Sequence, residues 1–142
     1  MDRRLRLEHA YHNESVCHYI DNNGSFPDWV ITTAFYASLH FVSYKLFPMT
    51  VNDNGKITIH NTLEQYKKAY RNSSDKHTIL SDLVYSNYPN ISTEYDELLG
   101  YCKTARYVHY KTKQWKCKRA IEIVNHIKIG LGFPNTLPDG LI

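Results

Sequence analysis

Hydrophobic residues recur along most of the chain with the 3.6-residue period of an α-helix, and this pattern predicts an all-α protein. The glycines and prolines, 6 and 5 in number, lie between the periodic segments rather than within them. The pattern predicts a first helix over about residues 2–21, which the sequence Asp21-Asn22-Asn23-Gly24 ends. The residues expected to face inward from this helix are Leu5, Val16, Tyr19 and Ile20.

The segment 28–47 is apolar on nearly every face, which is typical of a helix at the buried centre of a bundle. Ser25 and Asp28 have the spacing of a capping box at its start, and Pro27 falls in the first turn, where its missing N–H costs nothing. Pro48 is expected to end this helix. We therefore expect the segment to be the central helix of the fold.

The rest of the chain predicts one loop and further helices. Asn54-Gly55, within residues 49–56, predicts a turn or hairpin-like loop. Apolar residues at helical spacing then predict helices over residues 60–72, over residues 75–87, after a cap at Ser92 or Thr93, and over a last stripe at residues 117–131. The sequence thus predicts a single all-α bundle of five or six helices over residues 1–132 and an irregular tail at residues 133–142.

The composition is that of a globular protein. Apolar residues make up 42% and charged residues 22%, which excludes a disordered tail and a coiled coil. No apolar run approaches the roughly 18–20 residues of a membrane span, and none follows the basic start. Cys17, Cys102 and Cys117 are too few and too scattered for a disulfide framework or a zinc knuckle. We therefore expect a cytoplasmic protein without a signal peptide or a membrane contact.

Positive charge is concentrated in one segment. Residues 98–121 contain seven cations and no acid, although the net charge of the chain is only +3. The cations are Lys103, Arg106, Lys111, Lys113, Lys116, Lys118 and Arg119, and the rings interleaved with them are Tyr101, Tyr107, His109, Tyr110 and Trp115. Cations bind phosphates and aromatic rings stack on unpaired bases, so the segment predicts contact with RNA or a nucleotide. Two alternatives remain open: a solvated pair of basic helices whose tyrosines belong to the core, and a surface for another anionic partner.

His40 lies within the apolar segment 28–47, where a polar ring without partners costs several kcal/mol. One interpretation is a core histidine hydrogen-bonded to a tyrosine or to the helix that contains residues 102–107. The other is a polar pocket lined by His40, Tyr36, Lys103, Arg106 and His60. The other histidines do not form a sequence such as H-E-x-x-H, so we predict neither a metal site nor a cofactor.

Several of these residues also carry a resemblance to a known family. The sequence DWVITTAFYASLH at residues 28–40, the later His60 and CKTARY at residues 102–107 together resemble the HEPN superfamily. One HEPN subgroup has an aspartate-tryptophan start, F-Y-A-A-L-H in the long helix, a histidine after the loop and S-R-x-A-R-Y near a later helix end. The matching residues are Asp28, Trp29, Phe35, Tyr36, Ala37, Leu39, His40, Ala105, Arg106 and Tyr107. The resemblance covers about residues 5–130 and implies a small helical bundle of the kind found in prokaryotic toxin, defence and nucleotide-associated proteins.

The resemblance also implies a possible activity. Many HEPN proteins are metal-independent ribonucleases in which an arginine and a histidine, separated by about four to six residues, face a second copy across a homodimer. The arginine steadies phosphate charge, and the histidine moves the proton of the attacking 2′-hydroxyl. Here the candidate catalytic pair is Arg106 and His109, which have two intervening residues and would share one face of a continuing helix. Arg119 and His126, with six intervening residues, are a second candidate pair.

The function predicted from the sequence is therefore that of a HEPN-like domain, as a homodimer, which binds RNA or a nucleotide in a toxin or defence context. Besides Arg106, the residues expected to bind are His40, Tyr36, His60, Lys103, Tyr107 and Tyr110. A metal-independent ribonuclease with Arg106 and His109 as its catalytic residues is one alternative. The other is an interaction module that pairs with a partner protein such as a nucleotidyltransferase.

Overall fold

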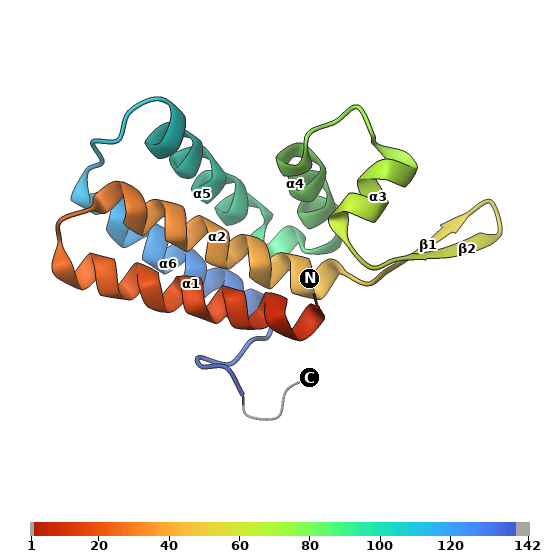
Figure 1. Ribbon diagram of the computed structural model, residues 1–142, viewed down its shortest axis with the longest axis horizontal. Helices are drawn as coiled ribbons and strands as arrows, with labels where there is room; N and C mark the ends of the chain where they lie inside the picture. The colour runs from red at the N-terminus through yellow and green to blue at the C-terminus, as the bar shows by residue number, and fades with distance from the viewer. Residues whose placement is uncertain (1, 139–142) are drawn as a thin grey trace.

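The computed structural model describes residues 2–138, which form six α-helices and one two-stranded antiparallel sheet (Figure 1). The helices are α1 (Arg3–Asn23), α2 (Pro27–Leu46), α3 (Leu63–Tyr70), α4 (Lys76–Asn87), α5 (Pro89–Tyr107) and α6 (Gln114–Gly130). The strands β1 (Met49–Asp53) and β2 (Lys56–His60) form a hairpin between α2 and α3. The predicted all-α bundle of five or six helices is confirmed, and the hairpin adds two short strands.

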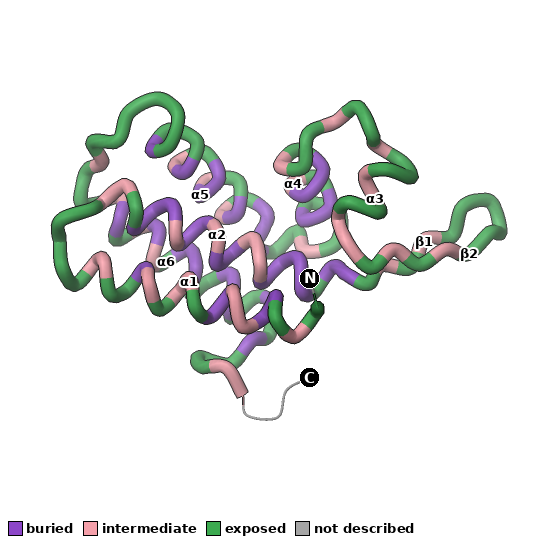
Figure 2. Tube along the Cα trace, viewed as in Figure 1, coloured by how far each residue is buried: buried purple, intermediate pink, exposed green. Residues whose placement is uncertain are grey.

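Helix α2 lies at the centre of the bundle, as its apolar sequence predicts. It packs against α1, α5 and α6, and Figure 2 shows it buried along most of its length. Its Phe35 ring contacts Tyr95 of α5, and its Phe41 ring contacts Tyr11 of α1. Burial of such a side chain stabilises the fold by about 1.5–3 kcal/mol, so α2 organises the core. Although α2 is apolar, neither it nor another helix within residues 2–138 is long and apolar enough to cross a membrane.

The inward face predicted for α1 is wrong at Leu5 and Tyr19, whereas Ile20 is half-buried against the core as predicted. Leu5 and Tyr19 are exposed, and a different stripe of the helix is buried. That stripe consists of Arg6, Leu7, Ala10, Tyr11 and Cys17. It continues through Glu14, a charged residue that makes this face look polar in the sequence. The Glu14 carboxylate lies 2.9 Å from Nζ of Lys128 on α6, so its charge is paired inside the fold.

Two predicted helix starts also differ from the structure. Helix α2 begins at Pro27 with Phe26 as its N-cap, so the predicted capping by Ser25 is wrong. Helix α5 begins at Pro89, before the predicted cap at Ser92, which is instead a buried residue inside the helix. Each helix starts with a proline, whose fixed φ angle and missing N–H both suit the first helical position. Proline geometry therefore starts these helices where a side-chain cap was expected.

The predicted turn at Asn54-Gly55 closes the β1–β2 hairpin. Both residues have a positive φ angle, 51° and 90°, as this type of tight hairpin turn requires. His60 is paired with Met49 at the open end of the hairpin, so the prediction that His60 opens a helix is wrong. Residues 56–60 alternate β-branched and polar side chains, a pattern that favours a strand, and α3 starts only after a cap by Thr62.

Residues 133–138 form neither helix nor strand, but they are packed against the bundle. The Phe133 ring contacts Phe41 and Tyr44 of α2, with ring centroids 4.9 and 5.6 Å apart. The Tyr11 hydroxyl donates a 2.7 Å hydrogen bond to the carbonyl of Pro134. This part of the predicted irregular tail therefore covers one end of the core, and the remainder of the prediction, residues 139–142, lies outside the described residues.

Replacing Gly130 by alanine is expected to lower the free energy of unfolding by about 1–3 kcal/mol, because the added methyl group overpacks the core. A Cβ atom at this position would overlap Cγ2 of the fully buried Ile91 and lie 3.0 Å from Nδ2 of Asn90. Gly100 is a matched control in α5, since a Cβ atom there meets nothing within 4 Å. We expect Gly100→Ala to be neutral or stabilising by up to about 1 kcal/mol in urea denaturation. Equal effects of the two substitutions would contradict the close α5–α6 contact.

Candidate functional site

The connection between α5 and α6 carries the basic segment. Helix α5 ends at Tyr107, and residues 108–113 form neither helix nor strand before α6 begins. Tyr107, Tyr110 and Trp115 are 72%, 67% and 56% exposed, so the alternative that placed the tyrosines of this segment in the core is wrong for Tyr107 and Tyr110. We call the region the basic–aromatic surface. Its exposed residues are Lys103, Arg106, Tyr107, Tyr110, Lys111, Lys113, Trp115 and Lys118.

Two cations of the basic segment, Arg106 and Lys116, lie beside aromatic rings. The guanidinium carbon of Arg106 is 5.3 Å from the ring centroid of Tyr107. Nζ of Lys116, which is half-buried, is 5.7 Å from the ring of Trp115 and 5.5 Å from that of Tyr101. Such contacts stabilise exposed pairs by only about 0.5–1 kcal/mol, so they do not prevent a ring or a cation from binding something else. If a base stacks on one of these rings, the neighbouring cation lies close enough to bind the phosphate of the same strand.

One cation of the segment is already paired. Nε of Arg119 donates to Oε2 of Glu97 at 2.8 Å, and Nη2 donates to Oε1 of the same carboxylate at 3.0 Å. This two-point contact lowers the pKa of Glu97 and leaves the Arg119 charge balanced. Arg119 therefore adds little to the positive field, although it belongs to the same acid-free stretch of sequence.

A hollow of about 490 Å³ adjoins the basic–aromatic surface. It lies between the turn that joins α1 to α2 and the connection after α5, and its lining is mostly apolar. The lining residues are Ser25, Phe26, Pro27, Asp28, Tyr110, Lys111 and Thr112. The Cys117 thiol at the start of α6 donates to the carbonyl of Pro27 at 3.4 Å, which ties the two sides together. The hollow offers an apolar recess next to the exposed Tyr110 ring.

The predicted catalytic pairs are not assembled in the way that the sequence suggested. His109 lies beyond the end of α5, so the prediction that Arg106 and His109 share a helical face is wrong. The helix stops because the N–H groups of Val108 and His109 both donate to the carbonyl of Thr104. Nδ1 of His109 then accepts a 3.0 Å hydrogen bond from the N–H of Lys111, and Nη1 of Arg106 donates to the Tyr36 hydroxyl.

The second candidate pair is engaged with acidic residues. Arg119 binds Glu97 as described, and Nε2 of His126 lies 3.6 Å from Oε1 of Glu94. Both partners come from α5, which runs beside α6. The two residues therefore serve the packing of α6 against α5.

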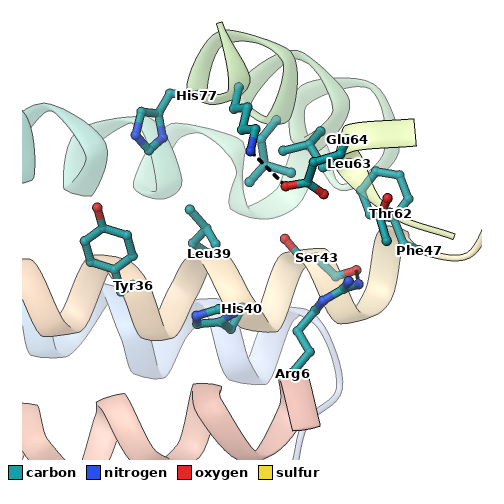
Figure 3. Close-up of a pocket in the computed structure, with 12 residues that line it drawn as sticks. Arg6, Tyr36, Leu39, His40, Ser43, Phe47, Thr62, Leu63, Glu64 and His77 are labelled. Carbon is teal, nitrogen blue, oxygen red and sulfur yellow. Dashed lines mark hydrogen bonds and ion pairs between the residues drawn. The ribbon is translucent and has the colours of Figure 1, made fainter. Parts of the chain in front are cut away.

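A second feature, a pocket of about 440 Å³, lies between α1 and α2 on one side and α3 and α4 on the other (Figure 3). The α2 side chains Tyr36, Leu39, His40 and Ser43 follow one another along its floor in Figure 3. The remaining lining residues are Arg6, Phe47, Thr62, Leu63, Glu64, Lys76, His77 and Leu80. This volume is within the range of small-molecule binding sites, about 300–1,000 Å³.

His40 has the environment of a pocket residue. Within residues 2–138 its ring makes no hydrogen bond, so the predicted bond to a tyrosine or to the helix of residues 102–107 is absent. Its ring meets that of His9 edge-on, with centroids 5.2 Å apart. Burial lowers the pKa of His40 to about 4, helped by the nearby His9 and Arg6. The ring is therefore neutral at pH 7 and presents one donor and one acceptor to the pocket.

The structure divides the remaining predicted binding residues between separate places. Tyr36 and His40 line the pocket, whereas Lys103 and Arg106 lie on the basic–aromatic surface and do not line it. The hydrogen bond from Arg106 to the Tyr36 hydroxyl joins the two regions. His60 lies on β2, where its Nε2 is 3.2 Å from hydroxyl oxygens of both Thr58 and Tyr70.

The sequence did not single out most of the pocket. Arg6 lies on the buried stripe of α1, and its position beside Leu7 on that stripe was the one available signal. Glu64, Lys76 and His77 belong to α3 and α4. They reach the pocket only because α3 and α4 fold back over α2, which the sequence pattern does not reveal. Within residues 2–138 no group of three or more histidine, cysteine, aspartate or glutamate side chains is placed to hold a metal ion.

In comparisons with known proteins, no family model, no curated protein and no solved structure matches the chain. The resemblance to the HEPN superfamily therefore stays a prediction.

Proposed function

We propose that this protein binds single-stranded RNA through the basic–aromatic surface, as a HEPN-like domain. The observation that carries the proposal is the exposure of Tyr107, Tyr110 and Trp115 next to cations that have no acidic partner in their own segment. Sequence-tolerant binding of single strands combines these two features: cations follow the phosphates, and rings stack on the bases. A surface for a generic anion would need the cations but not the exposed rings.

The alternatives have less support. The ribonuclease alternative depended on a helical face shared by Arg106 and His109, and the helix ends before His109. The homodimer and the nucleotidyltransferase partner rest on the resemblance. We therefore expect the protein to bind RNA without cleaving it. Light scattering of the purified protein measures its oligomeric state.

The double substitution Lys111→Ala/Lys113→Ala is expected to weaken binding of a fluorescently labelled single-stranded RNA about tenfold near 0.15 M salt, because two phosphate contacts are lost. The slope of log affinity against log salt should fall by about 1.4. Lys56→Ala/Lys68→Ala is the matched control, since these exposed lysines lie on the hairpin and on α3. Fluorescence anisotropy over a range of salt concentrations measures both quantities. Equal losses in the two double variants would contradict the proposal, as would binding without salt dependence.

The contribution of stacking is tested separately from charge. Tyr110→Ala is expected to weaken RNA binding by about 1–3 kcal/mol, which is the range measured for one base stacked on one ring. Tyr85 on α4 is exposed to a similar extent, 72%, and Tyr85→Ala is the control. Neither ring is in the core, so thermal stability should hardly change. Unchanged affinity of Tyr110→Ala would show that the Tyr110 ring does not stack on a base.

A further inference from the structure

We propose that the pocket between α1, α2, α3 and α4 binds a small phosphate monoester with a ring-bearing body, of the size and shape of a nucleoside 5′-monophosphate. This site is separate from the basic–aromatic surface, and the inference does not depend on RNA binding. Arg6 would hold the phosphate, and the end of the pocket at Tyr36 and His77 would hold the ring. The sequence had placed Tyr36 and His40 together with the basic segment, whereas the structure gives them a pocket of their own.

Arg6 is the residue that points to an anion. Its side chain is only 9% exposed, yet within residues 2–138 its guanidinium makes a single hydrogen bond, a long one of 3.5 Å from Nη1 to the carbonyl of Ser43. A guanidinium carries five N–H donors, and leaving them unused in a buried position is costly. In Figure 3, Arg6 rises from α1 toward Ser43 and the pocket. A phosphate there could accept two of these donors at once, the geometry that guanidinium groups favour.

The charges around the pocket favour the same ligand. Glu64 is the acid that lines it; Nζ of Lys76 lies 2.9 Å from its carboxylate, and the same carboxylate raises the pKa of Arg6 against the larger effect of burial. Nearby cations lower the pKa values of two histidines that line the pocket: Arg6 lowers that of His40, and Lys103 lowers that of His77. These effects are secondary to burial, and Asp75 opposes them at His77. Three of the four charged side chains that act on the two histidines, Arg6, Lys103 and Arg106, are cations, and this balance favours an anionic ligand.

The shape of the pocket argues for a ligand longer than phosphate. Tyr36 and Ser43 are seven residues apart on α2, and a helix rises about 1.5 Å per residue, so the floor extends roughly 10 Å from the Arg6 end. Leu39, Leu63, Leu80 and the Tyr36 ring make much of the lining apolar. Between the two ends, His40 and the Ser43 hydroxyl make no side-chain hydrogen bond within residues 2–138. These polar groups are placed to bind hydroxyl groups between a ring and a phosphate.

The first test uses purified full-length protein and isothermal titration calorimetry with AMP, GMP, CMP and UMP. We expect at least one of the four to bind, and the matching nucleoside and inorganic phosphate to bind at least tenfold more weakly. Arg6→Lys and Arg6→Met should lower the affinity at least tenfold, while Lys68→Met, an exposed control on α3, should not. Failure of all four nucleotides to bind would overturn the proposal, and so would equal affinity in a folded Arg6→Met variant.

The second test needs no substitution at Arg6 and follows the ring protons of His40 by NMR. A bound phosphate favours the charged imidazolium, so the ligand should raise the pKa of His40 from about 4 toward its ordinary value. By linkage, the contribution of His40 to the affinity should increase as the pH falls below its raised pKa. The ionisable groups that face His40 across the pocket or beside it are His9, Arg6, Glu64, Lys76 and His77. A ligand that leaves the His40 titration unchanged would overturn the assignment of this pocket.

The two proposals fail independently. Lys111→Ala/Lys113→Ala should keep its affinity for the nucleotide, because neither lysine lines the pocket. Arg6→Lys should keep its affinity for RNA, because Arg6 is buried away from the basic–aromatic surface. If the lysine variant lost nucleotide binding, the nucleotide would be bound at the RNA surface and the pocket proposal would be wrong.

Discussion

Glu14→Ala is expected to lower the free energy of unfolding by about 3–5 kcal/mol, the cost of leaving a buried charge without its partner. The Lys128 side chain is 2% exposed, and its Nζ lies 2.9 Å from each oxygen of the Glu14 carboxylate. Its other hydrogen bond, 2.8 Å long, goes to the carbonyl of Asn135. The rings of Tyr11 and Phe41, 5.3 and 6.0 Å away, complete an otherwise apolar surrounding. Without Glu14, the buried ammonium group would keep one hydrogen bond, to the Asn135 carbonyl, and two aromatic rings as neighbours. These neighbours do not replace the hydration that the charge loses on burial.

Urea denaturation at pH 7 measures this loss, and an exposed ion pair provides the control. Arg71→Ala removes the contact between Arg71 and Asp82, whose carboxylate side chain is 58% exposed, and should cost less than about 1 kcal/mol. The double variant Glu14→Leu/Lys128→Met, which removes both charges, should recover most of the stability. If Glu14→Ala cost no more than Arg71→Ala, the Lys128 ammonium would have to reach water, and the packing of the 133–138 segment would need revision.

Truncation after Gly132 is expected to destabilise the protein by about 3–5 kcal/mol, although residues 133–138 form neither helix nor strand. It deletes the Phe133 ring from its position against Phe41 and Tyr44. It also deletes the carbonyl that accepts from the Tyr11 hydroxyl and one of the partners of Lys128. A segment without regular structure thus contributes to the core as a helix would.

Truncation after Pro138 is the matched control, because it keeps each of these contacts. Thermal and urea denaturation of the two shortened chains give the comparison, and Phe133→Ala in the full chain separates the ring from the hydrogen bonds. We expect Phe133→Ala to account for at least half of the loss. Equal stability of the two truncated chains would mean that residues 133–138 only rest on the surface.

The parts of the fold that could be predicted were those determined by residues close together in the sequence. The uniform apolarity of residues 28–47 identified the central helix, and Asn54-Gly55 identified the hairpin turn, because each signal arises from residues next to one another. The positive segment at residues 98–121 was predicted in the same way, and its exposed rings follow from the end of α5 at Tyr107. What such signals cannot give is which residue of one helix meets which residue of another.

Two of the errors come from that gap, and a third has a local cause. The buried face of α1 was missed because Glu14 looks exposed until Lys128, more than a hundred residues later, is placed against it. The pocket was missed for the same reason, since Arg6 and His77 line one pocket only through the packing of α1 and α4 on α2. The pair of Arg106 and His109 was misplaced by a shorter-range effect, the capping of α5 at the Thr104 carbonyl.

The central position of α2 also has a consequence during synthesis of the chain. About 70 residues separate the end of α2 from the start of α6, one of the helices that cover it. At roughly 5–20 residues per second, a ribosome needs about 4–14 s to make them. Until α5 is made, α1 is the one helix of α1, α5 and α6 that can shield the apolar surface of α2, and the surface that α6 covers stays open for the whole of that time. The nascent chain should therefore recruit chaperones most strongly when its C-terminal end lies between α2 and α6. Slower translation of this stretch should increase aggregation of the chain.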